Sequence, residues 1–128
     1  MNKEIYNLKY DSAHIKRVQS ASLDKTYNGI KIENGLLFGT EDWFDAIETG
    51  LIKTQVISGT ISKVYMAGHN DFAEFEIDSD GNKTRWERKG IDDVYIVGRQ
   101  VELIYAIQTF KRGVPTQCVI KINISADT

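Results

Sequence analysis

Hydrophobic and polar positions alternate most clearly in residues 72–89, FAEFEIDSDGNKTRWERK. Asp80-Gly81 in the middle of this stretch predicts a two-residue type I′ turn, because both central positions of that turn require a positive φ. Counting outward from the turn gives the cross-strand pairs Asp78–Lys83, Ile77–Thr84, Glu76–Arg85, Phe75–Trp86 and Glu74–Glu87. On one face of the hairpin, two of these pairs bring opposite charges together, and on the other face Phe75 and Trp86 bring two aromatic rings together. Cross-strand pairs of both kinds stabilise an antiparallel hairpin.

Alternation continues through the rest of the second half of the chain. Residues 55–67 are rich in β-branched side chains, and Gly59 among them predicts a bulge or a sharp bend. Residues 99–110 and 118–124 each place apolar side chains on one face. The apolar positions are Val101, Leu103, Tyr105 and Ile107 in the first stretch, and Cys118, Ile120, Ile122 and Ile124 in the second. We therefore expect five antiparallel strands between residues 54 and 125.

The first half of the chain predicts a hairpin and one helix. Residues 29–38 turn back at Asn34-Gly35, and Asn-Gly is a strong hairpin signature. Thr40 is a favourable N-cap for a helix over residues 40–50, and the two acidic residues that follow it suit the positive end of the helix dipole. The apolar stripe of this helix consists of Phe44, Ile47 and Leu51, with Trp43 beside it. In residues 1–27, Tyr6, Leu8 and Tyr10 alternate with polar residues as in a strand, and the segment that follows fits either a short helix capped by Ser12 or a polar strand.

Together these elements predict a mainly β, α+β fold in which residues 1–128 form a single domain. Residues 1–53 carry the N-terminal hairpin and the helix over 40–50, and residues 54–125 carry a five-stranded antiparallel meander. A meander of this length tends to curl, because closure removes exposed strand edges. We expect a small, strongly bent antiparallel β-barrel or half-barrel with one short packed helix; a two-layer α+β sandwich is the alternative.

Charge and composition narrow the classes of function. The chain has 128 residues, 16 of them basic and 18 acidic, and a net charge of −2. A dedicated nucleic-acid binder usually has a basic excess, so nucleic acid is disfavoured as a partner, although a local basic patch stays compatible. The single cysteine, Cys118, cannot form an internal disulfide and fits a reducing compartment. There is no signal-peptide pattern and no apolar run of about 18 residues, so we expect a cytoplasmic protein without membrane contact.

No motif for catalysis, metal binding or a cofactor is present. His14 and His69 have no second ligand at metal-binding spacing, and Cys118 is in phase with the apolar face of the last strand. We therefore assign no catalytic residue, no metal and no cofactor, and a non-enzymatic function is favoured over an enzymatic one.

Residues of the predicted hairpin form the main candidate surface. Glu74 and Glu87 face each other, and exposure to water makes the cost of their repulsion small; neighbouring Lys89 or Arg88 also relieves it. An exposed tryptophan at position 43 would be a natural anchor for a partner, whereas packing over the core is the alternative. The candidate ligand-binding or partner-binding residues are Trp86, Arg85, Arg88, Glu74, Glu87, His69 and Trp43.

Three hypotheses for the function follow. The leading one is a non-enzymatic binding or interaction module for a protein partner or a small ligand. The second is a β-barrel that binds single-stranded nucleic acid or oligosaccharide through Trp86, Arg85, Arg88, Tyr65 and Tyr105. The third is a small hydrolase-like enzyme that uses the paired carboxylates of Glu74 and Glu87, which requires them to line a pocket. Unpaired sheet edges are also compatible with a homo-oligomer.

Overall fold

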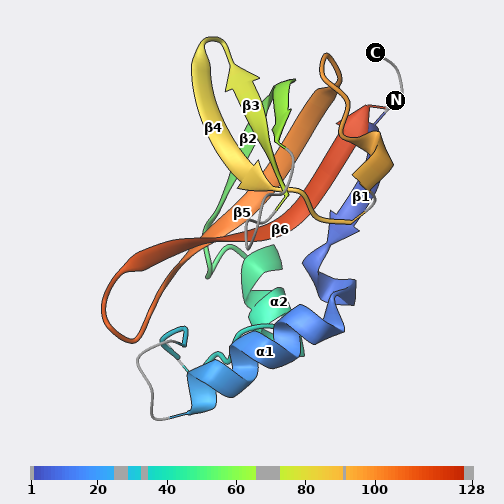
Figure 1. Ribbon diagram of the computed structural model, residues 1–128. Helices are drawn as coiled ribbons and strands as arrows, with labels where there is room; N and C mark the ends of the chain where they lie inside the picture. The colour runs from blue at the N-terminus through green and yellow to red at the C-terminus, as the bar shows by residue number, and fades with distance from the viewer. Residues whose placement is uncertain (1, 25–28, 33–34, 66–72, 91, 126–128) are drawn as a thin grey trace. The chain divides into compact units, whose positions relative to one another are not determined.

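The computed structural model describes residues 2–24, 29–32, 35–65, 73–90 and 92–125 (Figure 1). The strands are β1 (Asn2–Asn7), β2 (Thr54–Tyr65), β3 (Glu74–Ser79), β4 (Asn82–Glu87), β5 (Gln100–Thr109) and β6 (Pro115–Ser125). The helices are α1 (Ser12–Leu23) and α2 (Glu41–Glu48), with short 3₁₀ turns η1 (Leu8–Tyr10) and η2 (Asp92–Val94). The predicted mainly β, α+β class is confirmed, and a second helix, α1, accompanies the one that the sequence predicts.

The six strands form one open sheet in the order β1-β6-β5-β2-β3-β4. All five strands expected between residues 54 and 125 are present. They do not follow one another as a simple meander, because β5 returns to pair beside β2 instead of beside β4. The sheet does not close into a barrel, so β1 and β4 are its two edges.

The β3–β4 hairpin has the predicted register from end to end, including Phe75 opposite Trp86 and Glu74 opposite Glu87. Asp80 and Gly81 have φ values of 53° and 90°, as a type I′ turn requires. The Asp78 carboxylate accepts a hydrogen bond of 2.7 Å from the Gly81 amide and so braces the turn. Local pairing across a tight turn was enough to specify this hairpin.

Strand β2 carries its irregularity at a different residue from the one expected. The register between β2 and β3 shifts between Ile61 and Lys63, not at Gly59. Gly59 instead permits a close approach of backbones, because a Cβ atom there would overlap the Asp78 carbonyl oxygen. The glycine is therefore explained by packing against β3.

The apolar face predicted for residues 99–110 is correct only in its first half. Val101 and Leu103 are buried, but Ala106 is also buried and Ile107 is 47% exposed. The buried positions thus change phase by one residue within β5. In β6 the predicted pattern holds for Ile120, Ile122 and Ile124, which are all buried.

Residues 2–24 include both a strand and a helix. Strand β1 ends at Asn7, and α1 begins at Ser12 with Asp11 as its N-cap, the Asp11 carboxylate accepting a bond from the His14 amide. Of the two alternatives predicted for the segment around Ser12, the structure thus shows the helix. Leu23 lies outside the core, because its side chain is 66% exposed.

The hairpin expected at residues 29–38 is not formed by the described residues of that segment, which contain no strand. Ile30 forms an isolated antiparallel bridge with Phe110, flanked by a bond of 2.7 Å from the Lys31 amide to the Thr109 carbonyl. The pairing partner is thus the end of β5, which sequence spacing does not reveal. Asn34 of the predicted turn lies outside the described residues.

Helix α2 has the predicted start. The Thr40 hydroxyl accepts a hydrogen bond of 3.3 Å from the Trp43 amide, and Gly50 has a φ of 84° after the last turn. The side chain of Trp43 is fully buried, so the alternative in which it packs over the core is the one observed. Leu51, predicted on the apolar stripe, is 64% exposed because it follows the end of the helix.

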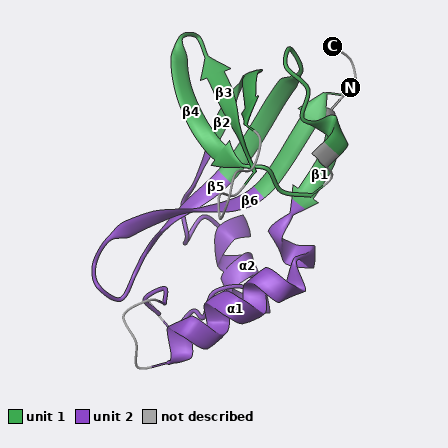
Figure 2. Cartoon of the chain, in the orientation of Figure 1, with its two compact units in different colours: residues 1–6, 56–104, 121–128 green, residues 7–55, 105–120 purple. Residues whose placement is uncertain are grey.

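The chain divides into two compact units (Figure 2). Unit 1 contains residues 1–6, 56–104 and 121–128, and unit 2 contains residues 7–55 and 105–120. The largest fully buried side chains of unit 1 are Phe75, Ile61, Ile77, Leu103, Ile122 and Ile124. Those of unit 2 are Trp43, Phe38 and Leu8.

Candidate functional site

The described part of unit 1 carries a cluster of polar side chains across β2, β3 and β4. Alternation in the hairpin turns Phe75 and Trp86 into the core, so their neighbours in sequence point to the opposite side of the sheet. We call this surface the polar face and define it as Ser62, Tyr65, Glu74, Glu76, Arg85 and Glu87. It contains three of the seven candidate residues predicted from the sequence.

Arg85 is held at two points within the polar face. Its Nε lies 2.8 Å from the Glu74 carboxylate, and its guanidinium carbon lies 3.7 Å from the centre of the Tyr65 ring. The ion pair therefore runs diagonally to Glu74, although Glu76 is the register partner of Arg85. Stacking and pairing together fix the planar guanidinium while its side chain stays exposed.

Glu76 is fixed by two hydroxyl donors from β2. Ser62 Oγ lies 2.7 Å from one carboxylate oxygen, and the Tyr65 hydroxyl lies 3.2 Å from the other. The Ser62 bond is the main cause that lowers the pKa of Glu76; desolvation opposes it, and the Tyr65 bond and the charges of Lys83 and Lys63 add to it. Glu76 is therefore ionised near neutral pH and cannot serve as a proton donor there.

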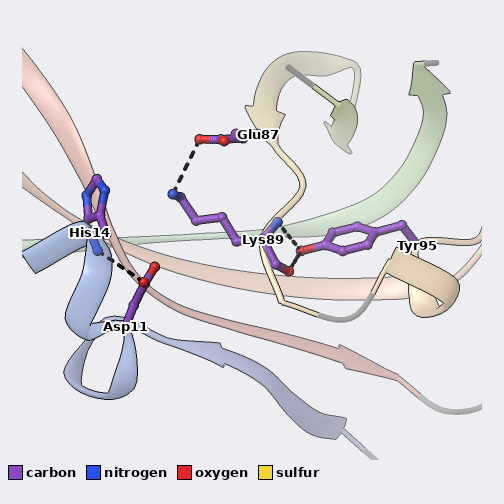
Figure 3. Close-up of polar contacts among 5 residues, drawn as sticks. All are labelled: Asp11, His14, Glu87, Lys89 and Tyr95. Carbon is purple, nitrogen blue, oxygen red and sulfur yellow. Dashed lines mark hydrogen bonds and ion pairs between the residues drawn. The ribbon is translucent and has the colours of Figure 1, made fainter. Parts of the chain in front are cut away.

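The like-charged pair Glu74–Glu87 is relieved by cations on both sides. Arg85 neutralises Glu74, and Lys89 Nζ lies 3.3 Å from the Glu87 carboxylate (Figure 3). Lys89 was one of the two cations expected to do this. The other, Arg88, instead donates from Nη2 to the Tyr65 carbonyl at 3.1 Å. The two carboxylates thus form separate ion pairs on a sheet face.

The Tyr95 hydroxyl holds the backbone of Lys89, two residues after the end of β4. This hydroxyl accepts a hydrogen bond of 3.0 Å from the Lys89 amide and donates one to the Lys89 carbonyl (Figure 3). The Tyr95 ring packs on Phe75, with 4.7 Å between the ring centres. No motif in the sequence marks Tyr95 for this role, although Lys89 lies only six residues before it.

Both candidate tryptophans are buried with their indole N–H groups bonded. Trp86 is 7% exposed and donates to Thr84 Oγ1 at 2.8 Å. Trp43 donates to the Gln108 side chain at 3.3 Å within unit 2. Stacking of a ligand on the Trp86 ring, which the nucleic-acid and oligosaccharide hypothesis invokes, would need the core to open. His69 lies outside the described residues.

The other histidine considered from the sequence, His14, makes structural contacts. His14 packs edge-on against Phe38, with 6.0 Å between the ring centres, and its amide is the one bonded by Asp11 in Figure 3. Within the described ranges, no group of three or more His, Cys, Asp or Glu side chains could hold a metal ion. No helix of the described chain is both long and apolar enough to span a bilayer.

Described residues of unit 2 line two hollows. The more enclosed has a volume of about 160 Å³ and is lined by Leu36, Trp43, Leu51, Ile52, Lys53, Ile107 and Gln108. The second is open and is lined by Ile107, Pro115, Thr116 and Gln117. Neither is lined by Glu74 or Glu87, which the hydrolase hypothesis requires in a pocket.

Comparison with models of protein families identifies a family. The model of the protein family described as "Immunity protein RhsI2" matches residues 2–125, which is nearly the whole chain. No curated protein matches the chain.

Proposed function

The chain belongs to the RhsI2 immunity protein family, and we propose that it protects by binding a toxin protein directly, without chemistry on it. The observation that carries this proposal is the family match over residues 2–125. An immunity function of this kind needs a stable, specific protein–protein surface. We propose the cytoplasm as the place of binding, and a sequence with a single cysteine, Cys118, fits a reducing compartment.

We propose the polar face of unit 1 as the toxin-binding surface. Arginine and tyrosine are the residue types that most often dominate the energy of a protein interface, and Arg85 and Tyr65 stack at its middle. Their side chains are already ordered by Glu74 and Glu76. A surface that is ordered before binding loses less conformational entropy when the partner arrives.

Truncation of Arg85 tests this surface. We expect Arg85→Ala to weaken toxin binding at least about tenfold, or roughly 1.4 kcal/mol, because the central planar cation is lost. The probe is the cognate toxin, purified with an inactivated active site, and the dissociation constant is measured by calorimetry. The matched control is Lys121→Ala, which removes a cation paired with Glu4 at 3.5 Å elsewhere in unit 1.

Comparison of the two variants distinguishes a local effect of the polar face from a general effect of net charge. Each removes one positive charge and one exposed ion pair, so a general electrostatic effect would weaken binding equally. Equal affinities for Arg85→Ala and the unaltered protein would exclude the polar face as the binding surface. A toxin that does not bind the unaltered protein would overturn the proposed function itself.

A further inference from the structure

The outer edge of β4 offers backbone groups that no described strand pairs with. In the order of the sheet β4 is the last strand and has β3 as its only neighbour in the described chain (Figure 1). In a two-residue hairpin, the residues next to the turn exchange hydrogen bonds, and this alternates along the strands. The amides of Asn82, Thr84 and Trp86 therefore point to β3, and those of Lys83, Arg85 and Glu87 point away.

Two contacts at the end of the strand agree with this phase. The Arg88 amide donates to the Ala73 carbonyl at 2.8 Å, so Arg88 continues the inward series. Lys89 continues the outward series, and both of its outward backbone groups are bonded by the Tyr95 hydroxyl. Tyr95 thus closes the edge at Lys89 and leaves an open window from Lys83 to Glu87.

We propose that the toxin binds by adding an extended segment to the edge of β4 over residues Lys83–Glu87. This inference rests on the proposed function and states how the polar face is used. Strand addition satisfies the outward N–H and C=O groups in a regular ladder, and the side chains that flank it give specificity. The polar face then continues from β4 onto the added strand.

The charges along the window define the chemistry of the segment. Cross-strand neighbours of opposite charge stabilise a ladder, so a carboxylate belongs opposite Lys83, whereas Glu87 is already paired with Lys89. Arg85 is already paired with Glu74 and stacked on Tyr65, and needs only a polar neighbour. On the other face the segment lies beside Trp86, where an apolar residue fits.

A second copy of the chain is the alternative occupant of this window. Antiparallel pairing of two β4 strands over the whole window places Arg85 opposite the Arg85 of the other copy, and places each Lys83 opposite the Glu87 of the other copy. Like charges directly opposite each other destabilise a ladder, whereas opposite charges stabilise it. Self-pairing thus combines one unfavourable contact with two favourable ones, and the family match, not the charges, favours the toxin as the occupant.

Amide hydrogen exchange of the unaltered protein tests the proposal without any variant. We expect the amides of Lys83, Arg85 and Glu87 to exchange rapidly in the free protein and to slow at least about tenfold with the inactivated toxin. The amides of Thr84 and Trp86 serve as internal controls, since they are protected by β3 in both states. Each rate is read by NMR on labelled full-length chain.

Proline at the edge supplies a second test. Lys83→Pro removes an outward N–H and no bond to β3, a position where proline is tolerated in an edge strand. We expect it to bind the toxin at least about tenfold more weakly than Lys83→Ala, which loses the same side chain but keeps the N–H. Circular dichroism of both variants checks that the hairpin is retained.

The possible outcomes lead to different conclusions. If the toxin binds but the outward amides do not slow, strand addition is wrong and the proposed function stands. If the toxin does not bind the unaltered protein, the proposed function is wrong, and strand addition is wrong with it. If the outward amides are already protected in the free protein, and more so at higher concentration, a second copy occupies the edge and the proposal is overturned.

Discussion

Single side chains on the polar face are positioned by donors from a neighbouring strand. Glu76 illustrates this, because Ser62 and Tyr65 of β2 each donate to one of its carboxylate oxygens. Hydrogen bonds to the charged form favour ionisation, which is why its pKa is lowered. The carboxylate then keeps Tyr65 oriented beneath Arg85.

Removal of the stronger donor should raise the pKa of Glu76 toward its ordinary value. We expect Ser62→Ala to do this, because the 2.7 Å bond from Ser62 is the main cause of the shift. The measurement is an NMR titration of the Glu76 side-chain carboxyl carbon. Ser58→Ala, an exposed serine of the same strand, is the control; an unchanged Glu76 titration in Ser62→Ala would contradict the assignment.

The same lowered pKa gives the pH dependence of stability a sign. A carboxyl whose pKa is lower in the folded state contributes stability above its unfolded pKa and loses it as the pH falls through the folded value. Between about pH 5 and about pH 2, the unaltered protein should therefore lose more stability than Glu76→Gln. Urea unfolding at a series of pH values measures this, and parallel curves for the two proteins would count against it.

At the level of elements, the sequence specified what depends on neighbours in the chain. The β3–β4 register follows from a turn and pairs within a few residues of it, and α2 follows from its cap. The bridge of Ile30 with Phe110 and the return of β5 to β2 depend on residues far apart, so no local pattern contains them. The change of phase within β5 has the same origin.

In the candidate site, too, the sequence predicts the contacts within one hairpin and not those with other elements. The pairing of Glu74 with Glu87 came from counting along one hairpin, and so did the relief by Lys89. The contribution of Ser62 depends on the register between β2 and β3, which includes a bulge that Gly59 does not mark. Tyr95 lies only six residues after Lys89, but no sequence motif marks the contact of its hydroxyl with the Lys89 backbone.

The connection after β4 passes so close to β1 that only glycine fits. A Cβ atom on Gly90 would overlap the Ile5 carbonyl oxygen, whereas one on Gly98 would meet nothing within 4 Å. Both glycines have a positive φ, of 79° and 98°. Alanine at either position therefore costs about 1–2 kcal/mol for the backbone conformation.

Comparison of two alanine variants isolates the close approach. We expect Gly90→Ala to destabilise unit 1 by about 1–3 kcal/mol more than Gly98→Ala, because β1 or the connection must move. Urea unfolding measures both variants against the unaltered protein. Equal losses would mean that β1 does not lie against this connection.

At the scale of the whole molecule, the two units are interleaved along the chain. Unit 1 is built from three separate segments, and its central one, residues 56–104, lacks β1 and the end of β6. Buried Ile5 in β1 and buried Ile122 and Ile124 in β6 belong to the core of this unit. Binding experiments therefore require the full chain.

A fragment of residues 56–104 should not fold, although it contains the whole polar face and the edge of β4. Its sheet would lack a neighbouring strand at β5, and it would lose the apolar contacts of Ile5, Ile122 and Ile124, each worth about 1.5–3 kcal/mol when fully buried. That loss is comparable to the total stability of a small domain. Circular dichroism and amide dispersion in NMR measure the outcome, with the full chain as the control. A fragment that unfolds cooperatively and binds the inactivated toxin would show that unit 1 does not depend on its outer segments.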